Sequence, residues 1–303
     1  MTQSKETFGT ILAFIAAIIS GFSIFANKIF IVTLNPLIFT ATRAILLGGI
    51  FFLLSLYKSK WSFKGFKKVS WKYLIAIGVI GGGFAFLLFF SGLKITTSGR
   101  AAFLQKTLPF YVTLLAFFFL KEKIGKKQIT ALLLMFMGTI IISSAGITPA
   151  ELWSYPEFGD AFIISATILW AIENIISRKA MILGENNFVV SFGRMFFGAL
   201  ILFGMILLAN KFELLFYLTQ TEWMYILISS VILFAYVLTY YWSMKYVNVS
   251  KTSTILLFSP VITLILGVYF LNEPAPIFQV AGSAIILFGA CLISNIKSKF
   301  SGI

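Results

Sequence analysis

The chain has 303 residues, of which 59% are hydrophobic and 11% charged, and its formal net charge is +14. Soluble domains carry about 25% charged residues, so this composition excludes an ordinary water-soluble fold. The basic excess does not indicate a nucleic-acid partner, because most Lys and Arg residues lie in short segments between apolar blocks. The absence of histidine and the single cysteine, Cys291, exclude an internal disulfide and argue against zinc sites, Ser-His-Asp triads and Cys-His pairs.

Long apolar blocks follow one another along the chain, and a bilayer-spanning helix needs about 20 such residues. Helices are expected because backbone polar groups in lipid must be satisfied internally. The first block, Phe8 to Ala26, is expected to remain as a helix and not to be cleaved as a signal peptide. The chain is therefore predicted to be an all-α integral membrane protein. The ten predicted transmembrane helices are 8–28, 36–57, 72–93, 98–120, 127–146, 158–180, 188–209, 222–245, 251–271 and 276–296.

The distribution of basic residues predicts the orientation in the membrane. With the N-terminus in the cytoplasm, the outer segments contain only Lys28, Lys94, Arg100 and Lys211, and the inner segments contain most of the remaining Lys and Arg. Such a bias is typical of cytoplasmic loops. Both termini are therefore predicted to be cytoplasmic, in a multi-pass protein of the cytoplasmic membrane. The segment 61–68 mixes aromatic residues with lysines and is expected at the inner interface.

The two halves of the chain, 8–146 and 158–296, repeat each other at a spacing of about 150 residues. Each half has five predicted helices, an odd number, so the second half would enter the membrane from the opposite side. Inverted repeats of this kind are typical of secondary transporters that work by alternating access. The alternative is a duplicated scaffold without a transport role. Pro109, Glu122, Gln128 and Gly138 recur as Pro260, Glu273, Gln279 and Gly289 at one constant offset, and Arg43 recurs as Arg194.

Two five-helix repeats that share the pattern Pro, Leu-x-Glu, Gln and Gly resemble the drug/metabolite transporter superfamily, and most of all its EamA type. The two glutamates of the pattern follow Leu120 and Leu271. The resemblance covers residues from about 8 to 296. It implies a ten-helix inverted-repeat fold around a cavity lined mainly by helices 1, 3, 4, 6, 8 and 9. Members of this superfamily move amino acids, other metabolites or drugs in either direction, so the resemblance specifies neither substrate nor direction.

Charged residues at membrane depth are costly, so they are candidates for function. The repeat places Arg43 and Arg194 at mirrored depths, either as gating residues or as structural residues that snorkel or pair with a helix end. Pro109 and Pro260 each loosen a helix and free backbone carbonyls. A gating or structural role is assigned to Arg43, Arg194, Pro109, Pro260, Glu122 and Glu273.

Polar faces on the first and sixth helices predict the lining of a solute cavity. Spacings of three and four residues put Ser20, Ser23 and Asn27 on one face, and the matching face of the sixth helix carries Trp170 and Glu173. Glu173, with Asn174 beside it, either pairs with Arg194 or acts as a proton-coupling carboxylate. Tyr236 and Tyr240 share a face of the eighth helix, where they either line the cavity or pack between helices.

Lys106 breaks the symmetry of the repeat, because Leu257 occupies the equivalent position. It lies beside Gln105, three residues before Pro109. We predict that Lys106 contacts the solute, where its charge would favour a carboxylate or another anionic group. The alternatives are an ion pair with Glu173 and a side chain that reaches the outer interface.

Together these features predict a secondary transporter, expected to export small organic metabolites such as amino acids. No P-loop sequence is present, so ATP is not required, and no metal or cofactor is expected. The expected partners are the lipid bilayer and a small solute, with protons as a candidate coupling ion, and the protein would act as a monomer or a homodimer. A receptor or assembly subunit would bind solute without flux, and a channel would conduct faster than one conformational cycle per solute. An intramembrane enzyme would need clustered acid/base or metal-binding residues, which the sequence lacks.

Overall fold

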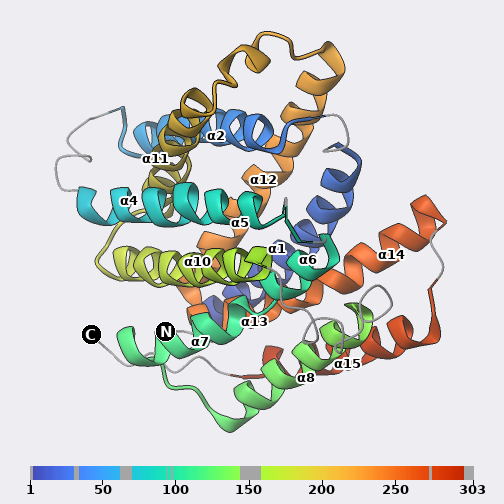
Figure 1. The fold of residues 1–303 in the computed structure, drawn as a ribbon. Coiled ribbons are helices and arrows are strands. Elements are labelled where there is room, and N and C mark those ends of the chain that lie inside the picture. The colour runs from blue at the N-terminus through green and yellow to red at the C-terminus, as the bar shows by residue number, and fades with distance from the viewer. Residues whose placement is uncertain are drawn as a thin grey trace.

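The computed structural model describes residues 3–30, 34–61, 70–93, 95–96, 98–143, 158–272 and 275–296. Glu273 and nearly all of the expected interface segment 61–68 lie outside these residues. All regular secondary structure in the described residues is helical (Figure 1). The first half contains α1 (Gln3–Phe30), α2 (Pro36–Lys58), α4 (Trp71–Ile77), the π-helix η1 (Gly78–Phe84), α5 (Ala85–Leu93), α6 (Ser98–Gln105), α7 (Leu108–Phe119) and α8 (Lys126–Ser143). The second half contains α10 (Phe158–Ile182), α11 (Asn187–Leu208), the 3₁₀ helix η2 (Phe212–Leu215), α12 (Gln220–Tyr246), α13 (Val249–Ile255), the 3₁₀ helix η3 (Leu256–Phe258), α14 (Ser259–Leu271) and α15 (Ile277–Ser294).

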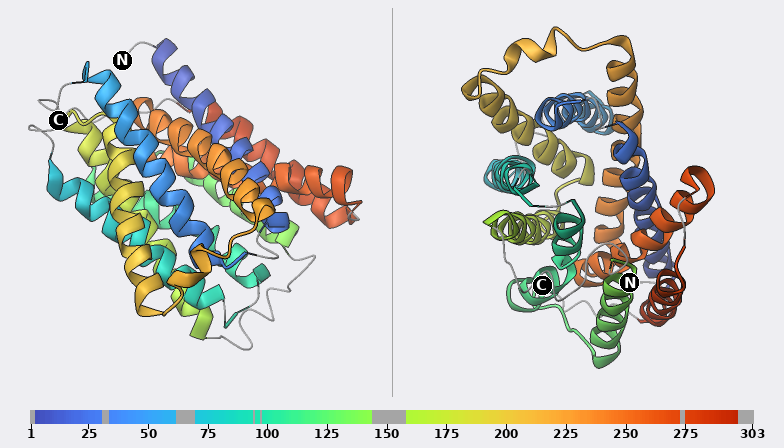
Figure 2. Two further views of the ribbon diagram at one scale, coloured as in Figure 1. Left: turned by 90° about the horizontal axis from the view of Figure 1, so that it is seen from above. Right: turned by 45° about the vertical axis from the view of Figure 1, so that its right-hand side comes forward.

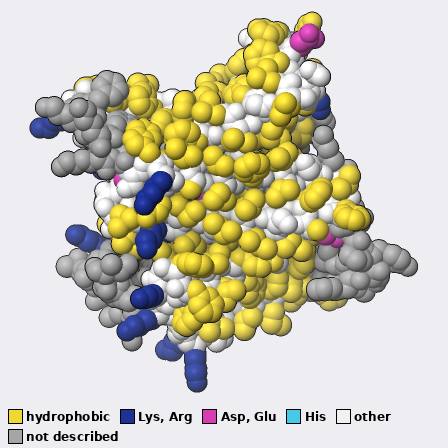
Figure 3. All heavy atoms as spheres, turned by 60° about the vertical axis from the view of Figure 1, so that its left-hand side comes forward, with side chains coloured by type: hydrophobic (Ala, Val, Ile, Leu, Met, Phe, Trp, Pro, Cys, Tyr) yellow, Lys and Arg dark blue, Asp and Glu magenta, His cyan; other side chains and the backbone are white. Residues whose placement is uncertain are grey.

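Nine helical runs within the described residues are long and apolar enough to cross a membrane, and Phe103–Phe119 forms a shorter apolar helix. The surface of the bundle is correspondingly apolar. Large side chains such as Ile11, Phe118 and Leu227 are more than half exposed. Figure 3 shows a broad hydrophobic surface with most of the visible Lys and Arg gathered along one edge. A soluble monomer rarely exposes so much apolar area, but a bilayer accommodates it. The chain is a multi-pass membrane protein.

Helices of the two halves pack against each other in pairs. The helix α2 runs along α11, α1 along α12, and α8 along α15, and α10 packs against α4, η1 and α5. Figure 2 shows the blue α1 among the orange and red helices of the second half. Glycine permits the closest approaches: Gly138 lies against the carbonyl of Gly282, and a Cβ at either position would overlap the opposite backbone.

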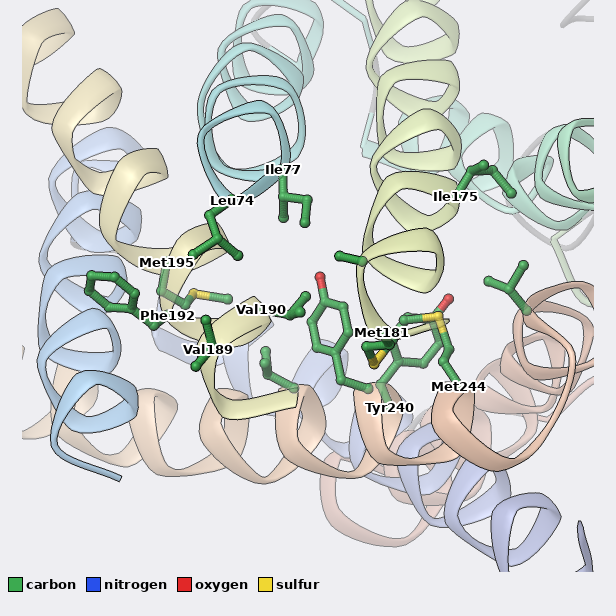
Figure 4. Close-up of a cluster of buried hydrophobic side chains, with 14 of the residues drawn as sticks. Leu74, Ile77, Ile175, Met181, Val189, Val190, Phe192, Met195, Tyr240 and Met244 are labelled. Atoms are coloured by element: carbon green, nitrogen blue, oxygen red, sulfur yellow. The ribbon is translucent and has the colours of Figure 1, made fainter. Parts of the chain in front are cut away.

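A hydrophobic core fills the space between α2, α4, α10, α11 and α12. It includes Leu47 and Phe51 of α2. Figure 4 shows Leu74 of α4, Met195 of α11 and Tyr240 of α12 pointing toward the same space. These side chains fix the relative positions of the helices that surround the cavity described below.

Two of the expected helices are interrupted near their proline residues. The expected span 98–120 divides into α6 and α7 at Lys106 and Thr107, and Pro109 lies in the first turn of α7. The expected span 251–271 divides in the same manner into α13, η3 and α14, with Pro260 in the first turn of α14. Proline lacks an N–H and its ring crowds the preceding turn, so a continuous α-helix is disfavoured at both places.

Candidate solute cavity

A cavity of about 270 Å³ lies between helices of both halves. It is enclosed by α1, α5, α6, α7, α10, α12, α13 and η3, with one residue from α11. These elements belong to the expected helices 1, 3, 4, 6, 8 and 9, which are the six that the resemblance implied. The expected seventh helix, α11, adds one residue to the lining. The lining residues are Ser20, Ser23, Ile24, Asn27, Phe86, Phe89, Gln105, Lys106, Leu108, Pro109, Trp170, Asn174, Arg194, Leu233, Tyr236, Tyr240, Ser253, Leu256 and Leu257.

Most residues that the sequence singled out as solute contacts lie in this wall, and Glu173 does not. Among the gating or structural candidates, Arg194 and Pro109 line the cavity, whereas Arg43, Pro260 and Glu122 lie outside it. The cavity residues come from distant parts of the chain, so the packing of the two halves brings them together.

Lys106 lies at the break between α6 and α7 and faces the cavity. Its Nζ donates a hydrogen bond to Ser259 Oγ of α14 at 3.0 Å. Among the described residues no carboxylate lies within ion-pair distance of Lys106, so the alternative of a pair with Glu173 does not hold in this structure. The break contributes to this geometry, because Pro109 ends the regular α-helical hydrogen bonding beside the lysine.

Glu173 is fully buried behind the cavity wall. Its Oε1 accepts hydrogen bonds from Ser177 Oγ at 2.7 Å and from the hydroxyl of Tyr241, and its Oε2 lies 3.4 Å from Arg194 Nη1. Arg194 also donates to Tyr241 Oη at 3.1 Å. The solute contact predicted for Glu173 is therefore not direct here, because these partners turn the carboxylate away from the cavity and place Arg194 in the wall.

Arg43 connects to the cavity through two further side chains. Its Nη1 donates to Ser229 Oγ of α12 at 2.6 Å, and Ser229 Oγ donates to Asn27 Oδ1 at 2.7 Å. Asn27 Nδ2 in turn donates to Ser23 Oγ at 3.2 Å, and both of these residues line the cavity. The guanidinium also lies over the Phe39 ring, 4.3 Å from its centroid. Each of the two repeat-related arginines thus bonds to α12, at different levels of that helix.

Aromatic rings form much of the remaining wall. The Trp170 indole donates from Nε1 to the carbonyl of Gly81 at 2.9 Å, and its ring centroid lies 5.2 Å from that of Phe86 and 5.3 Å from that of Phe89. Gly81 belongs to the π-helix η1, and π-helical turns often occur at functional sites. Tyr236 and Tyr240 stack with centroids 5.5 Å apart. The sequence did not single out Phe86 and Phe89 among 35 phenylalanines.

Glu122 of the first half holds the start of α13 in the second half. Its carboxylate accepts hydrogen bonds from the backbone N–H of Val249 at 2.8 Å and of Ser250 at 3.2 Å, and from the Ser250 hydroxyl. Gln128 Nε2 donates to the same hydroxyl at 2.9 Å. Burial raises the pKa of Glu122, and these hydrogen bonds and the charge of Arg178 oppose the rise. The shared pattern residues Glu122 and Gln128 therefore join the two halves away from the cavity.

The sequence profile of the EamA-like transporter family matches residues 7–144 and 157–295. The chain belongs to the EamA-like transporter family. It is 27% identical over 314 residues to the uncharacterized transporter YetK of Bacillus subtilis, covering 97% of this chain and 89% of that protein. It is also 27% identical over 226 residues to YyaM of the same organism, covering 73% and 72% of the two chains.

A solved crystal structure has the same fold as this EamA-like protein, with a TM-score of 0.78 at 18% sequence identity. The match covers 94% of this chain and 96% of the other. It supports the arrangement of helices around the cavity and, at this identity, nothing about the solute.

Lys251 is a buried cation of this EamA-like protein that the sequence reading did not single out for a role. Its Nζ donates to the carbonyl of Ile296 after α15 at 2.6 Å and lies 3.8 Å from Glu6 Oε1 of α1. The start of α1, the start of α13 and the end of α15 therefore meet at one end of the bundle. In the sequence, Lys251 stands out only as a lysine near the start of an expected helix, and such a position does not predict these contacts.

Proposed function

We propose that this EamA-like protein is a secondary active transporter that carries a small organic solute through the central cavity by alternating access. The observation that carries the proposal is the cavity itself. It is enclosed by helices of both halves and contains Lys106, whose charge has no carboxylate partner among the described residues. Arg43 also lacks a carboxylate partner among the described residues but lies outside the cavity, so the position of Lys106 in the cavity wall is the feature that favours a solute contact.

We propose that the chain crosses the membrane ten times in two inverted repeats, 8–146 and 158–296. The interrupted α6–α7 segment, fourth along the chain, would be the span that is added to the nine long apolar helices. The packing pairs support this arrangement, since α1 with α12 and α4–α5 with α10 exchange places when the two halves are swapped. The pairs α2 with α11 and α8 with α15 join equivalent helices of each half. Two inverted halves can exchange conformations, which gives inward-open and outward-open states.

We propose that the protein lies in the cytoplasmic membrane with both ends of the chain on the cytoplasmic side. The contacts of Lys251 with Glu6 and Ile296 support a common side for the two ends. The exposed Lys58 ends α2, Lys72 lies in the first turn of α4, and Lys123 lies between α7 and α8, all on the side that the positive-inside rule assigns to the cytoplasm. We propose export as the direction of transport, in line with the expectation from the sequence.

We propose that the solute carries an anionic group that binds Lys106, and that Glu173 is the candidate proton-coupling carboxylate. Glu173 would exchange its proton from behind the wall, since Arg194 separates it from the cavity. A solute that displaces Arg194 from Glu173 would change the charge balance around the carboxylate, and this contact offers a physical link between binding and protonation.

The test is counterflow and uptake of a pooled metabolite mixture by the purified chain in proteoliposomes, with and without a pH gradient. Accumulation driven by the gradient would support proton-coupled transport, and exchange without accumulation would indicate a facilitator or an antiporter. Lys106→Met should weaken solute affinity without loss of folded protein, and Lys106→Arg should retain most of it. Lys123→Met, at an exposed position between α7 and α8, is the matched control. Saturable binding without flux would instead favour the receptor alternative.

A further inference from the structure

The charges around the cavity have one sign. Two cations, Lys106 and Arg194, line it, and the described lining residues include no Asp or Glu. Arg194 is neutralised by Glu173 from behind the wall, at 3.4 Å. Within the described residues, Lys106 donates only to the neutral hydroxyl of Ser259. The wall therefore offers one positive charge for a ligand and no negative charge.

This imbalance discriminates between amino acids and simple acids. A carboxylate on either kind of solute can bind Lys106. An amino acid also brings an ammonium group, which would exchange its water for neutral acceptors such as Asn174 Oδ1 and would gain no carboxylate partner among the described lining residues. Burial of an unpaired charge is far more costly than burial of a neutral hydroxyl that forms hydrogen bonds.

Two neutral polar groups in the wall have unused hydrogen-bonding capacity. Asn174 Oδ1 and Tyr240 Oη are both buried and have no hydrogen-bond partner among the described residues. The orientation of the Asn174 amide is fixed, because its Nδ2 donates to the carbonyl of Trp170 at 2.9 Å and a carbonyl can only accept. A ligand hydroxyl can donate to Asn174 Oδ1 or accept from the Tyr240 hydroxyl once a side-chain movement exposes the atom to the cavity.

The apolar part of the wall suits a flat group. Phe86 and Phe89 pack around Trp170, whose indole is held by its hydrogen bond to Gly81. Rings held in this way bind planar or apolar groups at little cost in side-chain entropy. The volume of about 270 Å³ lies near the lower limit of ordinary ligand pockets, which span about 300–1,000 Å³, so the solute is small.

We propose that the cavity selects a small hydroxylated monocarboxylate with a planar apolar group and no ammonium group, and that it discriminates against amino acids. This inference rests on the proposed function, in which the cavity binds the transported solute. It also replaces amino acids as the leading example of that solute. Lys106 binds the carboxylate, Asn174 and Tyr240 bind the hydroxyl, and the rings around Trp170 contact the planar group.

Three probes that differ only at one carbon test the proposal: 3-phenyllactate carries a hydroxyl there, phenylalanine an ammonium and 3-phenylpropionate a hydrogen. Their affinities for the purified full-length chain are measured at pH 7 by ligand-induced shifts of the melting temperature, and their transport by counterflow in proteoliposomes. Phenyllactate should bind most tightly, with phenylalanine weaker by roughly tenfold or more because its ammonium gains no carboxylate partner. Phenylpropionate should fall between them, since it only leaves Asn174 and Tyr240 without partners.

A variant at Asn174 tests whether this residue binds the hydroxyl of phenyllactate. Asn174→Leu removes the acceptor with a side chain of the same branched shape, so most of the advantage of phenyllactate over phenylpropionate should be lost while both acids still bind. Asn187 is the matched control, because it is equally buried with unpartnered amide atoms but lies outside the cavity. Asn187→Leu should keep the order of the three probes.

The outcomes separate this inference from the proposed function. Phenylalanine binding as tightly as phenyllactate, or transport of pooled amino acids that the two acids do not inhibit, would overturn the inference and leave a transporter. The expected order of affinities without any flux would support the inference and overturn transport. An absence of both binding and flux, in folded protein, would overturn both.

Discussion

Loss of the Glu122 carboxylate should loosen the start of α13 and the junction between the two halves. In Glu122→Ala, the backbone N–H groups of Val249 and Ser250 lose their acceptor. Glu122 is only 7% exposed, so water does not readily replace it. A buried donor without a partner costs about 1–3 kcal/mol, so two of them predict a loss of about 2–6 kcal/mol in the free energy of unfolding.

The assay is the melting temperature of the purified protein in detergent, followed by tryptophan fluorescence. A loss of about 3 kcal/mol should lower it by about 6 °C or more, at about 2 °C per kcal/mol for a chain of this size. Glu222→Ala is the control, because Glu222 accepts from Thr219 at the start of α12 in an exposed capping box. That cap should contribute about 1 kcal/mol. Equal shifts for the two variants would refute the reasoning, because burial of the Glu122 contacts would then make no difference.

Three further predictions concern the helix contacts, proton coupling and pH. Gly81→Ala would place a Cβ against Glu173, so it should cost about 1–3 kcal/mol and lower the melting temperature. A Cβ added at Gly49 meets nothing within 4 Å, so Gly49→Ala should stabilise α2 by up to about 1 kcal/mol. Similar decreases in melting temperature for the two glycine variants would contradict this account. Glu173→Gln should abolish the dependence of transport on a pH gradient and leave solute exchange intact, and an unchanged pH profile would exclude Glu173 as the coupling group. Burial raises the pKa of Glu122 in the folded protein above its pKa in the unfolded chain. Protonated Glu122 therefore contributes stability that is fully present below the unfolded-state pKa and is lost as pH rises through the folded-state pKa. Glu122→Gln should therefore remove that fall from a plot of melting temperature against pH, and an identical fall in both proteins would assign it to another group.

The candidate site was only partly accessible from sequence. The face spacing of Ser20, Ser23 and Asn27 was enough to place them in the wall, since residues three and four apart share one side of a helix. The position of Glu173 was not, because its depth is compatible with either the cavity or the space behind it. The partners Tyr241 and Ser177 decide between the two. Sequence likewise cannot tell which amide atom of Asn174 is left without a partner, because this depends on the hydrogen bond that its Nδ2 forms in the folded chain.

Composition and spacing along the chain predict the class of protein, the approximate helix positions and the family, because apolar length, positive-inside bias and repeated motifs are properties of consecutive residues. Pro109 and Pro260 also predict loosened helices, since the missing N–H is local, whereas the interruptions at 106–107 and 256–258 are found only in the folded chain. Tertiary packing establishes that Arg43 bonds to Ser229, that Glu122 holds α13, and that Lys106 faces the cavity without a carboxylate partner among the described residues. The physical reason is that such contacts depend on the rotation and depth at which helices distant in sequence pack together, and no local pattern of residues fixes either quantity.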